Sequence, residues 1–174
     1  MLQIAAQFSG QLTNLSEIGR SVGLDHKTAD HELSRLVKTP KLHFIDSGLL
    51  TAMRGDSLSR LRADRTVFGA LLESFVFSEL LKLSAWTEER VMLFHYRDRD
   101  KLEVDFVLEN SAGEIVGIEV KSAASVTRRD FLGLERVASA AGSAFMQGIV
   151  LYDGVQTLSF ADNLRAVPLS ALWA

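Results

Sequence analysis

The sequence predicts an α/β domain preceded by a small all-helical module. Three observations favour this class: helical spacing of apolar residues over 14–36 and 68–83, and period-2 alternation over 103–121. Of the 174 residues, 47% are hydrophobic and 24% are charged, which is typical of a folded chain. We therefore expect an N-terminal module over residues 1–38 and a larger α/β domain over residues 39–174.

Charge and residue usage narrow the function classes. The formal net charge is −3, so any contact with nucleic acid must come from a local patch. The chain has no cysteine, which excludes disulfides and thiolate zinc sites and fits a reducing compartment. No stretch approaches the roughly 20 apolar residues that span a bilayer, and residues 1–4 lack the layout of a signal peptide. We expect a cytoplasmic protein with no membrane partner.

The N-terminal module has the pattern of a helix-turn-helix. Asn14 and Glu17 are spaced as a capping box, so the first helix starts there. Gly23 ends that helix in a tight turn, and Asp25 can cap the next one. Helix, glycine-containing turn and helix together indicate a helix-turn-helix.

The second helix of this module carries a candidate nucleic-acid surface. Lys27, His31 and Arg35 recur every four residues, so they share the face opposite the apolar one. Such a face can contact phosphates and base edges of DNA. The alternative is a solvated face on a purely structural helical hairpin, and both interpretations remain open.

Between the N-terminal module and a long helix predicted over residues 68–83, we expect a short strand, a short helix and a connecting segment. Pro40 ends the second helix, because proline lacks an N–H donor and fixes its own φ. Residues 41–45 read as a short strand and 49–53 as a short helix, and the polar residues 54–66 read as a solvated connection. A long helix over 68–83 follows.

The long helix places one carboxylate within its apolar stripe. Glu73 lies among Leu72, Phe75 and Val76, on a helix that is apolar over most of its surface. A buried carboxylate needs a partner. Glu73 is therefore either at the stripe's edge with a local partner or directed into a site.

Three predicted strands follow, over residues 93–97, 103–109 and 115–121. Ser111-Ala112-Gly113 joins the last two as a three-residue hairpin loop, since Gly113 is available for a positive φ. Asn110 then faces Glu114. In this antiparallel register the residue numbers of any two facing residues add up to 224.

That register predicts a polar cluster on one face of the hairpin. It sets Asp105 opposite Glu119 and Glu103 opposite Lys121, and residues two apart share a face. The other face would be fully apolar, as the domain core requires. The alternative interpretation is a solvated face with a Glu103–Lys121 salt bridge.

The cluster has the chemistry of a metal site. Two carboxylates in close contact repel unless a cation or a proton lies between them. Mg²⁺ prefers such oxygen ligands, so Asp105, Glu119 and the backbone carbonyl of Val120 are the candidate ligands. Lys121 could hold an attacking water or a phosphate oxygen. The implied reaction is metal-assisted hydrolysis of a phosphodiester.

The remaining segments complete an α/β order. We expect a helix over 128–141 and strands over 147–152, 155–160 and 165–169. Arg128 and Arg129 stand at the start of that helix, where they could bind phosphate or could simply be exposed.

Four motifs carry a family resemblance: F-I-D-S-G-L-L, G-A-L-L-E-S-F-V-F-S-E-L, Y-R-D-R-D-K-L-E-V-D-F-V-L and I-E-V-K-S. They resemble the domain of unknown function that follows the ATPase module in a group of bacterial and archaeal AAA+-type ATPases. V-D-F and E-V-K also look like the PD-(D/E)XK motif of restriction-endonuclease-like nucleases.

The resemblance implies a PD-(D/E)XK core behind the helix-turn-helix, with Glu73, Asp105, Glu119 and Lys121 as the catalytic-looking residues. No G-x-x-x-x-G-K-[ST] is present, so the ATPase module is expected outside this chain. Relatives carry a wing-like stretch after the helix-turn-helix that is missing here. Three functions stay open: a module that binds DNA or a partner protein, a Mg²⁺-dependent endonuclease, and a sensor domain without catalysis.

Overall fold

The computed structural model describes residues 11–12 and 41–173. The predicted helix-turn-helix, with Lys27, His31 and Arg35, lies outside these residues, as does the predicted boundary after residue 38. Both stay predictions. No helix in the described part of the chain is long and apolar enough to cross a membrane.

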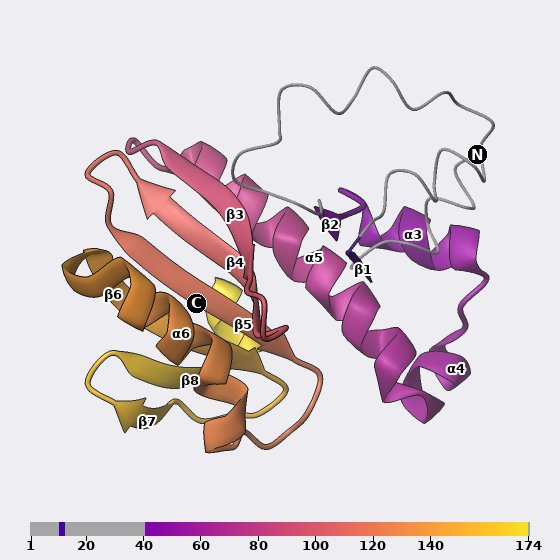
Figure 1. The fold of residues 1–174 in the computed structure, drawn as a ribbon. Helices are drawn as coiled ribbons and strands as arrows, with labels where there is room; N and C mark the ends of the chain where they lie inside the picture. Colours follow the sequence, from indigo (N-terminus) through magenta and orange to yellow (C-terminus); the bar gives the residue numbers. More distant parts are fainter. Residues whose placement is uncertain (1–10, 13–40, 174) are drawn as a thin grey trace. The chain divides into compact units, whose positions relative to one another are not determined.

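The chain divides into two compact units, residues 1–78 and 79–174, which are described separately. The first unit contains β1 (Gln11–Leu12) paired antiparallel with β2 (Lys41–Leu42), then α3 (Ser47–Arg54), α4 (Leu58–Ala63) and most of α5 (Arg65–Trp86) (Figure 1).

Local caps define the short helices of the first unit. The Asp46 carboxylate accepts a hydrogen bond from Leu49 N at 2.8 Å, which starts α3. Gly55 ends α3 with φ at 66°, a left-handed conformation that glycine adopts without strain. Leu50 and Leu71 form a small buried cluster.

Two predictions for this unit are corrected. The predicted strand over 41–45 has strand geometry only at Lys41–Leu42. The predicted solvated connection over 54–66 contains α4, because the Ser57 hydroxyl accepts from Arg60 N at 3.3 Å and caps a helical turn. The polar composition of this segment did not predict the N-cap at Ser57.

The second unit is built on a six-stranded mixed sheet in the order β3-β4-β5-β6-β8-β7. The strands are β3 (Val91–Arg97), β4 (Glu103–Asn110), β5 (Ile115–Lys121), β6 (Phe145–Tyr152), β7 (Leu158–Ala161) and β8 (Leu164–Pro168). The first three strands pair antiparallel, whereas β6 runs parallel to both β5 and β8.

One helix covers one face of this sheet. The 3-10 helix η2 (Arg128–Phe131) leads into α6 (Leu132–Ala141), which lies against β4, β5 and β6 (Figure 1). The core beneath it includes Phe131, Leu134 and Val137. Further core members from the strands are Val104, Phe145, Val150, Tyr152, Leu164 and Ala166.

The observed mixed α/β class and the element order agree with the sequence prediction. A long helix, three strands, a helix and a strand follow one another as α5, β3, β4, β5, α6 and β6. The predicted helix over 128–141 begins with the 3-10 turn η2 before it becomes α-helical.

A glycine sets how closely α6 approaches β4. A Cβ atom on Gly133 would overlap the backbone carbonyl oxygen of Glu103, which cannot move without disturbing the strand. The bare backbone at Gly133 is therefore a requirement of the packing rather than of the helix.

Replacing Gly133 with alanine should lower the free energy of unfolding by roughly 1–3 kcal/mol, because the added methyl group overpacks the contact. Urea denaturation measures this. Ser139→Ala on the exposed side of α6 is the control, where alanine's helix propensity makes the change neutral or slightly favourable. Equal stability of Gly133→Ala and wild type would contradict the close approach.

Candidate functional site

The predicted hairpin register is confirmed where the ladder is regular. Phe106 pairs with Ile118 and Glu109 with Ile115, so partners sum to 224. The loop has the predicted length, since Asn110 N donates to Glu114 O at 3.1 Å. Gly113 has a φ of 79°, as the turn requires.

Toward the other end of the hairpin, β4 contains a bulge that the sequence analysis did not foresee. Phe94 of β3 pairs with Val107, but Tyr96 pairs with Val104. Two β4 residues, Asp105 and Phe106, therefore lie opposite a single β3 residue. Bulges of this kind redirect side chains and occur often beside functional sites.

The bulge changes which residues share a face. Val104 and Val107 both pack against the core under α6, although a regular strand would put them on opposite faces. A Cβ on Gly117 would lie 2.6 Å from Leu134 Cδ2, so Gly117 faces α6 as well. By alternation, Glu119 and Lys121 follow Gly117 on that face.

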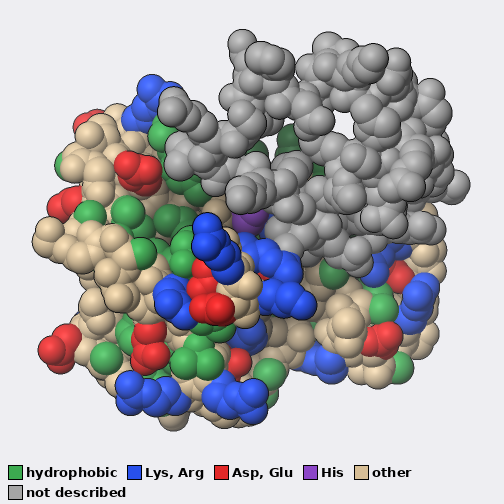
Figure 2. Space-filling model, in the orientation of Figure 1, with side chains coloured by type: hydrophobic (Ala, Val, Ile, Leu, Met, Phe, Trp, Pro, Cys, Tyr) green, Lys and Arg blue, Asp and Glu red, His purple; other side chains and the backbone are tan. Residues whose placement is uncertain are grey.

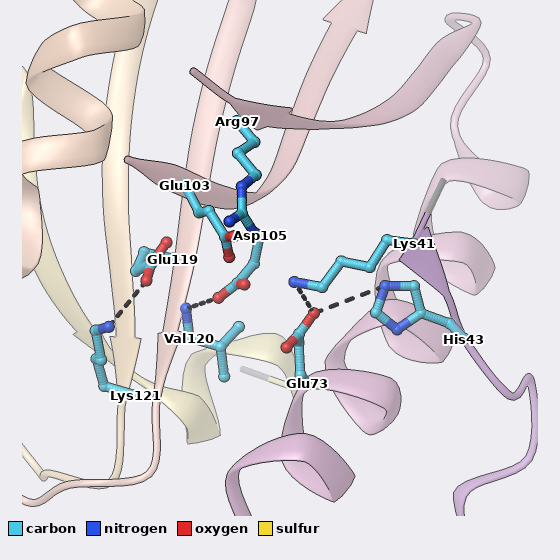
Figure 3. A network of polar contacts seen from close by, with 9 residues as sticks. All are labelled: Lys41, His43, Glu73, Arg97, Glu103, Asp105, Glu119, Val120 and Lys121. Carbon is cyan, nitrogen blue, oxygen red and sulfur yellow. Dashed lines mark hydrogen bonds and ion pairs between the residues drawn. The ribbon is translucent and has the colours of Figure 1, made fainter. Parts of the chain in front are cut away.

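The predicted single polar face is therefore wrong. Glu103 precedes Val104 and points away from α6, where its carboxylate pairs with Arg97 instead of Lys121. The carboxylates of Asp105 and Glu119 flank the backbone of Val120 (Figure 3). They are neighbours at the end of the hairpin, but they are not direct partners in a ladder.

Asp105 has a structural role at this point. Its side chain is 8% exposed, and its Oδ2 accepts a hydrogen bond from Val120 N at 2.9 Å. In a regular hairpin of this register, Val120 N would donate to the carbonyl of Val104, because 110–114 is a hydrogen-bonded pair and every second pair repeats it. The Asp105 carboxylate thus replaces a backbone acceptor.

Glu119 is the other buried carboxylate of the site. Its Oε1 accepts from Lys121 Nζ at 2.8 Å, while its Oε2 is buried without a hydrogen-bond partner among the described residues. Lys121 Nζ also lies 4.0 Å from Asp130 Oδ1. One ammonium therefore serves two acidic side chains, and half of the Glu119 carboxylate remains unsatisfied.

Burial and, second to it, the negative charge of Asp105 raise the pKa of Glu119 from 4.5 to about 7, although Lys121 acts in the opposite direction. Burial is the largest single effect on Lys121 and lowers its pKa, but the charge and the hydrogen bond of Glu119, together with the charges of Asp105 and Asp130, outweigh burial and raise that pKa. The two effects are coupled, since a proton on Glu119 removes the charge that holds the proton on Lys121. The raised pKa of Glu119 dominates this pair, because burial disfavours its charged form most strongly.

The site offers few acidic groups for a metal. Within residues 11–12 and 41–173, no group of three or more His, Cys, Asp and Glu side chains has an arrangement that could hold an ion. Two carboxylates still fit Mg²⁺, which commonly uses one or two together with water. The unsatisfied Glu119 Oε2 is the oxygen that a cation would satisfy.

Glu73 has partners within its own unit. Its carboxylate forms an ion pair with Lys41, and its Oε1 lies 3.7 Å from His43 Nε2. All three side chains are nearly buried, and His43 also stacks on Phe77 with ring centroids 4.7 Å apart. Figure 3 shows Lys41 and His43 directed at Glu73. Its participation in a site with Asp105 stays a prediction.

The remaining candidates differ in their contacts. Arg128 is 81% exposed in its side chain and lies 3.3 Å from Glu135 Oε1, so it belongs to the surface of η2. Arg129 is exposed on the same turn. Sequence reasoning missed Asp130, although Thr127 and Asp130 have capping-box spacing and Thr127 N donates to Asp130 Oδ2 at 2.8 Å.

Comparison with known proteins identifies the family. The family described as Domain of unknown function (DUF4143) matches residues 68–172. The chain belongs to the DUF4143 family. The match covers β3, β4, β5, α6 and the rest of the sheet, and therefore every residue of the Asp105–Glu119–Lys121 cluster.

One solved structure shows a weak similarity to this chain. Among solved structures, the DUF4143 domain is similar to the refined half-complex from the tetradecameric assembly of Thermococcus gammatolerans McrB AAA+ hexamers with bound McrC. Identity is 10% and the TM-score 0.38, and the alignment covers 57% of this chain and 27% of that one. No curated protein matches the chain.

Replacing Glu119 with glutamine should make the DUF4143 domain more stable at pH 8. The folded chain holds the Glu119 proton more tightly than the unfolded chain does. The bound proton therefore stabilises the fold fully below pH 4.5, and this stabilisation is lost as the pH rises through about 7. The loss in the free energy of unfolding is about 3 kcal/mol. A glutamine side chain stays neutral over this range and escapes the loss.

Urea denaturation between pH 4.5 and 9, with EDTA present, measures the difference. Wild type should lose stability over this range relative to Glu119→Gln. Glu88→Gln, at an exposed position, is the control and should follow wild type. Parallel curves for wild type and Glu119→Gln would show that burial does not hold the proton on this carboxyl.

Proposed function

We propose that the DUF4143 domain is a nuclease-like domain of the PD-(D/E)XK type, whose Asp105 and Glu119 bind a divalent cation. One observation carries the proposal: beside a second buried carboxylate, Glu119 is buried with one oxygen that has no hydrogen-bond partner within the described part of the chain. A buried negative charge of this kind requires a compensating positive charge.

The topology supports the same proposal. The order α5, β3, β4, β5, α6 and β6 matches the helix, three strands, helix, strand of the PD-(D/E)XK core. The two acidic positions of the motif correspond here to Asp105 on β4 and Glu119 on β5. The E-V-K triplet ends at the last residue of β5.

Each residue of the site has a distinct proposed role. Asp105 and Glu119 hold the cation, together with the Val120 carbonyl, and the cation when bound supplies Lewis acidity and an activated water. Lys121, two residues beyond Glu119, is placed to steady a phosphate oxygen or to orient the attacking water. A cation on Glu119 would release Lys121 from its present ion pair for that task.

A second candidate is a module that binds nucleic acid or a partner protein without catalysis. It is favoured by the ion pairs: Glu119 already pairs with Lys121, and Glu103 already pairs with Arg97. In this case the cluster is a remnant that stabilises the hairpin end. Arg128 and Arg129 are the exposed cations nearest in sequence to Lys121.

The visible surface suits local rather than extended contact with nucleic acid. Figure 2 shows Lys and Arg side chains interspersed with Asp and Glu side chains on the face presented. Such mixing gives a weak average potential, since opposite charges screen one another. Affinity for a phosphate backbone would have to come from a few residues.

The motif resemblance also leads us to propose that this domain works beside an AAA+-type ATPase module. To test this, the polypeptide that carries the domain is purified from its own cells, and its size and ATPase activity are measured. We expect either a longer polypeptide with ATPase activity or an ATPase partner that copurifies. A polypeptide of this length, purified without ATPase activity or an ATPase partner, would contradict the proposal.

Divalent cations should raise the melting temperature of the wild-type protein. A ligand that binds only the folded state adds about 2.7 kcal/mol at 100 times its Kd, which corresponds to roughly 5–10 °C here. Thermal melts with Mg²⁺ and Mn²⁺ measure the shift. It should vanish in Asp105→Asn and persist in Glu88→Gln. A melting temperature that ignores both ions in wild type would favour the second candidate.

If the site is catalytic, the wild-type protein should cleave plasmid or single-stranded DNA with Mg²⁺ or Mn²⁺. Asp105→Ala should abolish cleavage, and Lys121→Ala should lower the rate by roughly 100-fold, as expected for losing one charge that stabilises the transition state. Lys101→Ala is the control at an exposed turn. Equal cleavage by wild type and Asp105→Ala would assign the activity to a contaminant.

A further inference from the structure

Asp130 is an acidic side chain beside the site that the proposed cation chemistry does not use. Its Oδ1 lies 4.0 Å from Lys121 Nζ, at the margin of an ion pair, whereas Lys121 Nζ donates to Glu119 Oε1 at 2.8 Å. Without a cation, the ammonium is therefore bound to Glu119 and only approaches Asp130. Lys121 thus has a second carboxylate partner within reach.

The fold holds Asp130 in this position from both sides. Its Oδ2 accepts hydrogen bonds from Thr127 N at 2.8 Å and from Thr127 Oγ1 at 2.9 Å. The next residue, Phe131, is fully buried and packs against Phe160 with ring centroids 4.5 Å apart. One oxygen of the Asp130 carboxylate therefore anchors the turn, and the other oxygen, Oδ1, is the one that lies near Lys121.

The backbone of Lys121 is fixed as well, but its side chain is long and flexible. Lys121 is the last residue of β5 and pairs with the buried Tyr152 of the parallel strand β6. A lysine ammonium is carried on a flexible stem and has three donors. Because only side-chain rotation is needed, the ammonium can move from Glu119 to Asp130 without a change in the fold.

Charge balance favours this movement when a divalent cation binds. When ionised, the carboxylates of Asp105, Glu119 and Asp130 together with the Lys121 ammonium carry two net negative charges, which a divalent cation neutralises. An ammonium that stays on Glu119 repels the cation and occupies an oxygen that the cation needs. Paired with Asp130 instead, the ammonium no longer competes for that oxygen.

We propose that Asp130 is a positioning residue of the cation site, which receives the Lys121 ammonium when a divalent cation takes the place of that ammonium on Glu119. This inference rests on the proposed cation site. Asp130 does not touch the cation. It lowers the competition for Glu119 and keeps the ammonium at the site, where a phosphate oxygen of a substrate can meet it.

Two substitutions separate the charge of Asp130 from its role in the turn. Asp130→Asn removes the charge, but the amide oxygen of asparagine still accepts from Thr127. Thr127→Ala keeps the charge and removes one donor to it. A purely structural role of Asp130 would appear only in the free energy of unfolding, whereas a positioning role also changes the cation affinity of Asp130→Asn.

The first experiment measures the Kd for Mg²⁺ at pH 8 by NMR titration of the full chain. Asp130→Asn should raise the Kd by roughly fivefold, as expected for the loss of one partly exposed ion pair. Thr127→Ala should leave the Kd unchanged. In a Lys121→Met background, Asp130→Asn should change the Kd by less than about twofold, because no ammonium remains to be positioned.

The second experiment measures urea denaturation at pH 8 with EDTA, and it needs no cation. Asp130→Asn should lower the folding equilibrium constant roughly fivefold more in a Glu119→Gln background than in the wild-type background. The reason is that a neutral glutamine releases the Lys121 ammonium to Asp130. Equal effects of Asp130→Asn in the two backgrounds would overturn the transfer of the ammonium.

Failure of this inference differs from failure of the cation site. An Asp130→Asn variant that binds Mg²⁺ as tightly as wild type overturns the role of Asp130 alone. An effect of Asp130→Asn that persists in Lys121→Met also overturns that role, because the charge then acts on the cation directly. A wild-type protein that binds no Mg²⁺ overturns the cation site, and with it the role of Asp130 in cation binding.

Discussion

The hydrogen bond from Val120 N to Asp105 Oδ2 is the interaction on which the site depends. The bulge in β4 ends the regular ladder at Phe106–Ile118, and the partly buried Val120 amide would otherwise lose its acceptor. A carboxylate fills this place, so a negative charge is built into the end of the hairpin. Burial and, second to it, this negative charge raise the pKa of Glu119, so that buried carboxyl requires a proton, an ammonium or a metal ion beside it.

The hairpin register was predictable because two independent signals agree. The Ser111–Gly113 loop sets the turn, and the alternation of β4 and β5 around it allows only one pairing that buries the apolar residues. The bulge was not predictable, because E-V-D-F-V alternates regularly and no glycine marks the extra residue. It arises from pairing with β3, and that pairing depends on a long-range register that the hairpin sequence does not contain.

The long helix α5 was likewise predictable from its own sequence, whereas the partners of its buried carboxylate were not. Its apolar stripe predicts a helix, and α5 extends the predicted 68–83 at both ends. The apolar stripe does not predict which groups pair with the Glu73 carboxylate. Its partners Lys41 and His43 lie about thirty residues earlier in the chain. Likewise, Asp130 reaches Lys121 across a loop, and only the fold brings that pair together. Local patterns predict elements, whereas partners of buried charges depend on tertiary packing.

The central claim is that Glu119 is a buried carboxyl which binds a proton in the absence of metal and exchanges it for a cation. The most direct measurement is the carboxyl carbon chemical shift of Glu119 by NMR, followed against pH with and without Mg²⁺ and assigned with Glu119→Gln. The account predicts a midpoint near 7 without metal and conversion to the ionised form at pH 6 when Mg²⁺ is added. A midpoint near the usual 4.5 that does not respond to Mg²⁺ would contradict it.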